Sequence, residues 1–125
     1  MNLEGFVPYI LASGPVSISI SKNGLGVSKA AVAKLQNAPF VRILIDTKNN
    51  RLAIQVCDES DPAATVFSRS EKAEGLRWNT KDLNMTLRKM LGKPVENGEC
   101  YRIDGDFIED DHYPALIFDL NEANV

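Results

Sequence analysis

Five polar side chains in the first half of the chain have the types that contact nucleic acids: Lys22, Asn23, Lys29, Lys34 and Arg42. A DNA-facing surface needs cations that reach phosphates and donors that fix the register on the duplex. Lys22 and Asn23 are predicted on an exposed turn, and Lys29 lies beside a predicted helix N-terminus, which itself attracts phosphate. These five residues are the candidate DNA contacts. The alternative is that they are solvated surface side chains with no ligand.

A second group of residues has the chemistry of a cation site. Acidic side chains and the single histidine crowd one segment: Asp104, Asp106, Asp110, Asp111 and His112. Hard cations such as calcium prefer oxygen ligands of this kind. A calcium loop starting at Asp104 would need glycine at its sixth position, where this chain has Glu109. The sequence therefore predicts a solvated acidic loop and no metal site.

Catalytic motifs are not found in the sequence. The chain has one histidine, whereas acid-base or nucleophilic mechanisms need a partner that holds and tunes the base. There is no GxSxG motif and no P-loop, and Gly24-Leu25-Gly26 lacks the third glycine of a dinucleotide-binding fingerprint. We expect a protein that is not an enzyme and that needs no cofactor.

Charge is divided unevenly along the chain. Residues 16–56 hold six Lys and Arg residues against one Asp, a local charge of +5. Residues 99–125 hold eight acidic residues against one Arg, a local charge of −7, and the whole chain carries −3. The net charge does not favour nonspecific nucleic-acid binding, but the local charge matters more within a Debye length of about 8 to 10 Å. DNA therefore remains a possible partner of the basic segment.

Length and composition are typical of one globular domain. The chain has 125 residues, of which 44% are hydrophobic and 25% charged. An apolar run at residues 6–12 has no basic residues before it and contains Pro8, which argues against a signal peptide, and it is too short to span a membrane. We expect a cytoplasmic protein with no membrane partner. Cys57 and Cys100 are then predicted as reduced thiols, with a disulfide as the alternative.

Two stretches of the chain have the same order of predicted elements. In the first, residues 16–21 alternate as a strand, Ser28 caps a helix over residues 29–36 that ends at Asn37 and Pro39, and residues 40–45 and 52–56 form a hairpin around a turn at 47–50. In the second, residues 76–78 precede a helix over 81–91 capped by Thr80, and strands at 99–103 and 115–120 flank a loop at 105–114.

This order predicts an unequal internal duplication. The expected organisation is an N-terminal extension at 1–15, a basic first repeat at 16–56, a connection at 57–75 with a short strand-like piece at 65–67, and an acidic second repeat at 76–125. Trp78, Tyr101 and Phe118 are predicted to pack in the core, since they sit among apolar residues at the edges of elements.

The first repeat resembles the AbrB, MazE and SpoVT group of swapped-hairpin proteins. The residues that carry the resemblance are Ile18-Ser19-Ile20, Gly26-Val27-Ser28-Lys29, Leu35 and the hairpin at 41–56. Ser28 stands where that group usually has a proline, and Asn37-Ala38-Pro39 replaces its usual glycine-acid turn. The resemblance implies two units that interlock their hairpins into one small β-barrel and bind DNA as a regulator or antitoxin.

Together these features predict an α+β fold in which two β-α-β-β repeats form a small swapped-hairpin-like β-barrel with short helices. The leading hypothesis is a DNA-binding transcriptional regulator in which the basic repeat contacts duplex DNA and the acidic repeat stays away from phosphates. The alternative is a non-enzymatic protein-interaction module that does not bind DNA. In that case the oppositely charged segments pair with each other between copies or recruit a charged partner, and strand edges assist the pairing.

Overall fold

A computed structural model describes residues 5, 15–68, 75–92, 95–96, 98–109 and 113–123. The described strands are β1 (Ser17–Ser21), β2 (Gly24–Val27), β3 (Phe40–Asp46), β4 (Arg51–Val56), β5 (Thr65–Val66), β6 (Leu76–Trp78), β7 (Cys100–Ile108) and β8 (Ala115–Asp119). The helices are α1 (Lys29–Lys34), α2 (Lys81–Leu91) and a short 3-10 turn, η1 (Leu120–Glu122). The predicted α+β class is confirmed.

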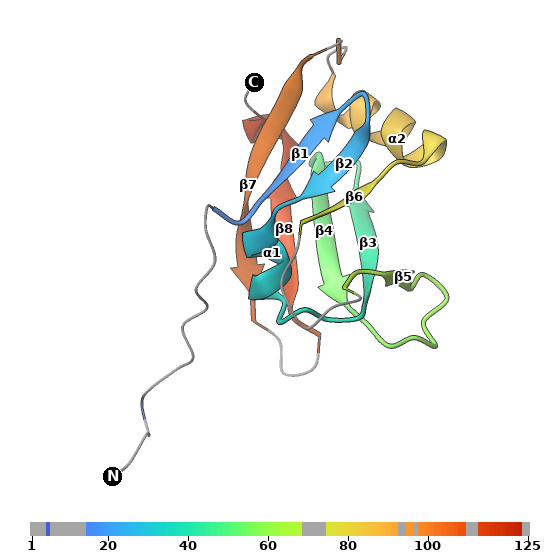
Figure 1. The fold of residues 1–125 in the computed structure, drawn as a ribbon. Helices are drawn as coiled ribbons and strands as arrows, with labels where there is room; N and C mark the ends of the chain where they lie inside the picture. The colour runs from blue at the N-terminus through green and yellow to red at the C-terminus, as the bar shows by residue number, and fades with distance from the viewer. Residues whose placement is uncertain are drawn as a thin grey trace.

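The strands form one antiparallel sheet in the order β5-β3-β4-β8-β7-β1-β2-β6. Figure 1 shows β1, β2 and β6 in front of β8, β4 and β3, so the sheet curls into a half-barrel with β5 and β6 as its edge strands. Helix α1 lies toward the lower end of the half-barrel in this view and α2 toward the upper end.

The curled sheet and both helices enclose one hydrophobic core. Period-two alternation directs Ile18 and Ile20 of β1 inward, and these side chains are only 1% and 2% exposed. Helix α1 contributes Val32 to the same core and α2 contributes Leu87. Because residues from both ends of the chain share this cluster, the two halves of the sheet stabilise each other.

Most predicted elements agree with the structure. The hairpin of β3 and β4 and the helix at residues 81–91 are confirmed. Phe118 and Tyr101 are buried, and the partly buried Trp78 packs on Phe67 with ring centroids 6.1 Å apart, as expected of core aromatic residues. Both cysteines are free thiols, with Cys57 buried and Cys100 exposed.

Three boundaries were predicted wrongly. Helix α1 ends at Lys34 rather than at residue 36, because Gln36 and Asn37 adopt left-handed φ values of 56° and 55°. Residues 24–27 form β2 rather than part of a glycine-rich turn, and β7 continues to residue 108, into the segment predicted as a loop. In both cases pairing with neighbouring strands offsets the low strand propensity of glycine.

Candidate nucleic-acid interface

Four residues form a row across the outer face of the half-barrel. In the strand register, Ser19 of β1 lies opposite Arg102 of β7 on one side and opposite Gly26 of β2 on the other. Gly26 in turn lies opposite Arg77 of β6. Residues directly opposite in an antiparallel sheet share one face, so the arginine row, Arg102, Ser19, Gly26 and Arg77, lies on the face away from the core residues Ile18 and Ile20.

Small residues form the floor between the two arginines. Ser17, Ser19 and Ser21 alternate along β1 with the buried isoleucines. At Gly26, an added Cβ would lie 2.5 Å from Ser19 Oγ and 3.4 Å from Arg77 Nη2. Glycine at this position therefore leaves room for the guanidinium group of Arg77 to lie across β2.

The two arginines are held loosely and remain available to a ligand. Arg77 donates from Nη1 to Ser21 Oγ at 3.1 Å, a neutral acceptor. Arg102 Nε is 3.7 Å from Asp104 Oδ1, and the two side chains are 53% and 73% exposed. Exposed ion pairs of this kind contribute little to stability, so Arg102 can exchange its partner at small cost.

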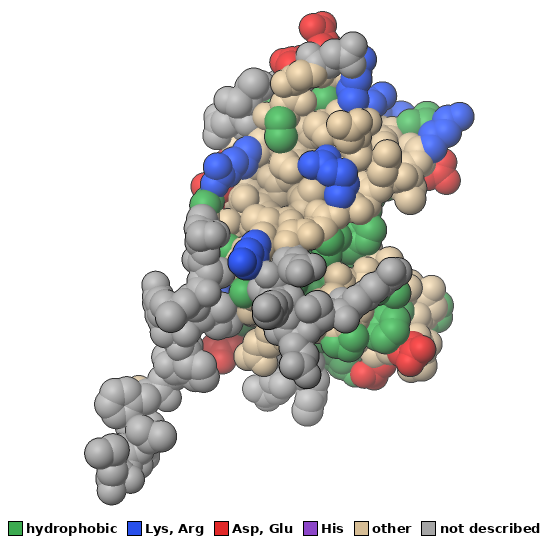
Figure 2. Space-filling model, viewed as in Figure 1, with side chains coloured by type: hydrophobic (Ala, Val, Ile, Leu, Met, Phe, Trp, Pro, Cys, Tyr) green, Lys and Arg blue, Asp and Glu red, His purple; other side chains and the backbone are tan. Residues whose placement is uncertain are grey.

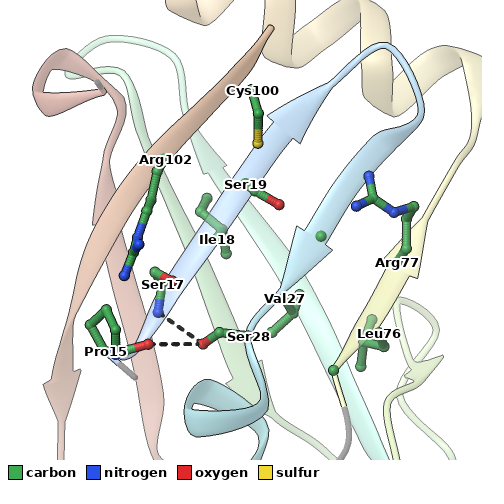
Figure 3. A pocket seen from close by; sticks show the side chains of 12 residues that line it. Pro15, Ser17, Ile18, Ser19, Val27, Ser28, Leu76, Arg77, Cys100 and Arg102 are labelled. Atoms are coloured by element: carbon green, nitrogen blue, oxygen red, sulfur yellow. Dashed lines mark hydrogen bonds between the residues drawn. The ribbon is translucent and has the colours of Figure 1, made fainter. Parts of the chain in front are cut away.

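A hollow of about 660 Å³ extends over this row. Figure 3 shows Arg102 on one side and Arg77 on the other, with Ser19 on the floor between them. Among the described residues that line the hollow, the charged side chains are these two arginines, without an acidic group. Figure 2 shows Lys and Arg side chains spread over this face of the molecule, with acidic side chains mainly at its margins.

Ser28 closes one end of the hollow. Its Oγ accepts from the N–H groups of Ala31 and Ser17, both at 3.1 Å, and donates to the carbonyl oxygen of Pro15 at 3.2 Å (Figure 3). The side chain therefore acts as the N-cap of α1, as predicted, and also ties the start of α1 to the start of β1.

The structure separates the five residues predicted from sequence. Lys22 and Asn23 occupy the exposed β1–β2 turn, and Lys29 is exposed at the start of α1, so these three lie on the strands and helix that border the hollow. Lys34 places its Nζ 4.7 Å from the ring centroid of Phe107, a cation–π contact. Arg42 lies on β3, which β4, β8 and β7 separate from β1 in the sheet.

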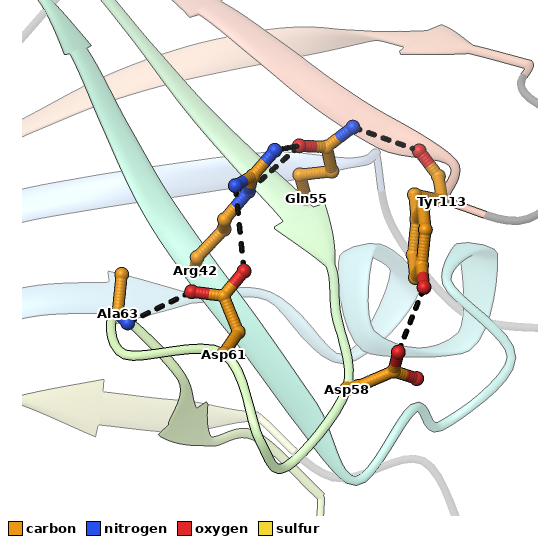
Figure 4. Close-up of polar contacts among 6 residues, drawn as sticks. All are labelled: Arg42, Gln55, Asp58, Asp61, Ala63 and Tyr113. Atoms are coloured by element: carbon orange, nitrogen blue, oxygen red, sulfur yellow. Dashed lines mark hydrogen bonds and ion pairs between the residues drawn. The ribbon is translucent and has the colours of Figure 1, made fainter.

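Arg42 belongs to a polar network of its own (Figure 4). Its Nε and Nη2 donate to Gln55 Oε1 at 2.9 and 2.7 Å, and Nη1 is 3.4 Å from Asp61 Oδ2. Gln55 donates in turn to the carbonyl oxygen of Tyr113, whose hydroxyl donates to Asp58 at 2.8 Å. That last hydrogen bond raises the pKa of Tyr113 above its ordinary value, since ionisation of the phenol would remove the donor.

Sequence reasoning did not select Arg77 and Arg102. Both lie in the segment at 76–125, which was expected to stay away from phosphates. The alternation of Tyr101 and Ile103 with Arg102 indicates that this arginine faces outward. No sequence signal, however, places β7 beside β1 or β6 beside β2.

The acidic segment offers no metal site within the described residues. Asp104 and Asp106 are exposed on β7, whereas Asp110, Asp111 and His112 lie outside the part of the chain that the structure describes. Across the described ranges, no three His, Cys, Asp or Glu side chains are grouped so as to hold a metal ion.

Comparisons with known proteins find no match among protein-family models, curated proteins or solved structures. In the described part of the chain, no helix has the length and apolar character needed to cross a membrane.

Proposed function

We propose that this protein binds duplex DNA by contacting the phosphate backbone with the arginine row, and that it acts as a DNA-binding regulator. The observation that carries the proposal is the placement of Arg77 and Arg102 on either side of a floor made of Ser19 and Gly26. Guanidinium groups bind phosphate through two parallel hydrogen bonds, and small residues between them let the backbone approach the sheet closely.

Electrostatics support a phosphate ligand. The lining of the hollow carries arginines without a carboxylate among its described residues, and the exposed Lys22 and Lys29 lie on elements that border it. Neutralisation of phosphates by such cations releases counterions, which drives binding at low salt. The net charge of −3 therefore averages over two unlike regions of the molecule.

The lining of the hollow favours contact with the backbone of a duplex over stacking with unpaired bases. Proteins that bind single strands use exposed aromatic side chains as stacking platforms. The residues that line the hollow include none, and Tyr101, the neighbour of Arg102 on β7, faces the core with 5% exposure.

The order of the elements supports the internal duplication that we infer. The described elements follow the order ββαββ twice, as β1-β2-α1-β3-β4 and β5-β6-α2-β7-β8. The pairing β1·β7 then corresponds to β5·β3, because each joins the first strand of one copy to the third strand of the other. Such an exchange is the relationship expected of swapped hairpins, and it would move the start of the second copy to β5, inside the segment assigned to the connection.

Binding to a labelled duplex of mixed sequence at several salt concentrations tests the proposal. Replacement of both Arg77 and Arg102 by alanine is expected to weaken binding at least tenfold and to lower the slope of log K against log salt by about 2, close to one unit per phosphate contact. Arg88→Ala on α2 makes the same chemical change outside the hollow and is expected to bind like the parent protein.

Three results would contradict the proposal. They are no binding to duplex DNA at low salt, equal binding by the double variant, and stronger binding to a single strand of the same length. Far-ultraviolet circular dichroism of each variant confirms that the fold is retained. The second candidate function, a protein-interaction module, is favoured by a different observation, the open edge of β3.

A further inference from the structure

Strand β3 has an edge that is open over most of its length. On the side away from β4, its neighbour β5 pairs only with Phe40 and Val41. Within the described ranges, no strand pairs with Ile43, Leu44, Ile45 or Asp46 on that side. Unpaired strand edges are ready sites for the addition of another strand.

The backbone groups that face this edge can be assigned from the bonds of the neighbouring residues. The carbonyl oxygen of Pro39 accepts from Phe67 N–H at 2.8 Å, on the β5 side. The carbonyl oxygen of Phe40 accepts from Cys57 N–H at 3.2 Å, on the β4 side. Because the direction alternates along a strand, the N–H and C=O groups of Ile43 and Ile45 point to the open edge.

The side chains along the same edge are partly apolar and exposed. Leu44 is 40% exposed on the outer face and Ile45 is 37% exposed on the inner face. Ile43 lines a hollow of about 270 Å³ together with Trp78 and Leu83. An incoming strand with aliphatic side chains would bury this surface, which favours association.

Charge along the outer face of β3 is arranged symmetrically about Leu44. Arg42 lies two residues before Leu44 and Asp46 two residues after it. Each is already held by its own chain, since Arg42 pairs with Asp61 at 3.4 Å and Asp46 pairs with Arg51 at 2.9 Å. An antiparallel copy of this strand would therefore place a positioned cation opposite a positioned carboxylate.

We propose that the open edge of β3 binds the same edge of a second copy of this chain, with a two-fold axis through Leu44. Ile43 of each copy then lies opposite Ile45 of the other, and these residues exchange their free backbone hydrogen bonds. Arg42 of each copy lies opposite Asp46 of the other. The aliphatic side chain of Ile45 from the second copy lies beside Ile43, at the hollow lined by Trp78 and Leu83.

The register follows from symmetry. A two-fold axis perpendicular to a continuous antiparallel sheet must pass through a residue, since opposed residues share a face. An axis through Ile43 would set Arg42 against Leu44 and would overlap the residues that pair with β5. An axis through Ile45 would set Leu44 against Asp46. Leu44 is therefore the position that matches charge with charge and aliphatic with aliphatic.

Sedimentation equilibrium over a range of protein concentrations tests the proposal without nucleic acid. The parent protein is expected to form dimers. Leu44→Lys places two ammonium groups at the axis and is expected to raise the dissociation constant at least tenfold. Met85→Lys, which changes an exposed residue on α2, is the matched control and is expected to leave it unchanged.

A charge-reversal experiment tests the register itself. Arg42→Glu alone and Asp46→Lys alone each create two like-charge pairs in a homodimer, so each variant is expected to dissociate. A mixture of the two variants forms two opposite-charge pairs and is expected to restore a heterodimer, detected by native mass spectrometry. Circular dichroism of each variant establishes that the monomer is folded.

Two outcomes would overturn the proposal. One is a parent protein that stays monomeric at all concentrations. The other is a dimer that persists in Leu44→Lys or whose folded charge variants do not recover on mixing. Both outcomes can be distinguished from failure of the proposed DNA interface, because no step of the test involves nucleic acid or the arginine row.

Discussion

The ring of Phe118 occupies the space that a side chain at Gly105 would need. The two residues lie directly opposite each other on β8 and β7. A Cβ built on Gly105 would overlap Cε1 of the ring and lie 2.8 Å from Cδ1. Since Phe118 is completely buried, the ring has no free volume into which to move.

Gly105→Ala is therefore expected to destabilise the protein by about 1 to 3 kcal/mol through overpacking. Phe118→Leu makes room beside residue 105 at a cost of its own in buried area. The double variant should lose less stability than the sum of the single variants, because the two residues are in contact. Urea unfolding of all four proteins at one concentration measures the coupling, and strictly additive losses would contradict this packing relationship.

Ser28→Ala is expected to lower the free energy of unfolding by about 1 to 2 kcal/mol, because one hydroxyl caps α1 and also binds the start of β1. Thr80→Ala is the matched control. Thr80 is the N-cap residue of α2 but makes no side-chain cap hydrogen bond. Thermal unfolding should therefore show a clearly larger loss for Ser28→Ala, and equal losses would show that the hydroxyl contacts of Ser28 contribute nothing.

Asp46→Asn is expected to make stability less dependent on acid. Hydrogen bonds from Asn49 and Arg51 lower the pKa of Asp46 from 3.8 to about 2 in the folded protein. A lowered folded pKa contributes stability that is present above pH 3.8 and is lost as the pH falls toward 2. Melting temperatures of both proteins should differ most near pH 6 and converge below pH 3. A constant difference across this range would contradict the assigned hydrogen bonds.

Iodoacetamide is expected to label Cys100 much faster than Cys57 in the folded protein. Cys100 is exposed at the hollow, whereas Cys57 is buried and burial raises its thiol pKa, which lowers the fraction of reactive thiolate. Mass spectrometry of peptides gives both rates, and unfolding in urea should make them similar. Bound duplex DNA should slow the labelling of Cys100 if DNA occupies the hollow, and equal rates with and without DNA would place the ligand elsewhere.

Local signals in the sequence were sufficient for several elements. Alternating side chains at residues 16–21 predicted β1, and a glycine after residue 91 predicted the end of α2, where Gly92 adopts a φ of 67°. Ser28 was predicted as a helix cap, and the turn between β3 and β4 was placed from its polar residues. These features depend on neighbours within a few positions, so the sequence contains the information directly.

Features that depend on distant residues could not be predicted in the same way. β2 contains two glycines in four residues and reads as a turn, yet it forms a strand because β1 and β6 pair with it on both sides. The extension of β7 past residue 104 depends on pairing with β8, whose Phe118 covers Gly105. Arg42 and Lys29 look alike as cations in the sequence, but Arg42 is bound to Gln55 and Asp61.

The sequence by itself determined the α+β class, the hairpin of β3 and β4, and the split into basic and acidic segments, since hydrophobic periodicity, capping residues and charge are local properties of the chain. Tertiary structure alone decided that Arg102 and Arg77 flank Ser19 and Gly26, and that the edge of β3 is left open. The physical reason is that strand order and register join residues far apart in the chain, and these depend on how the whole sheet buries its inner face.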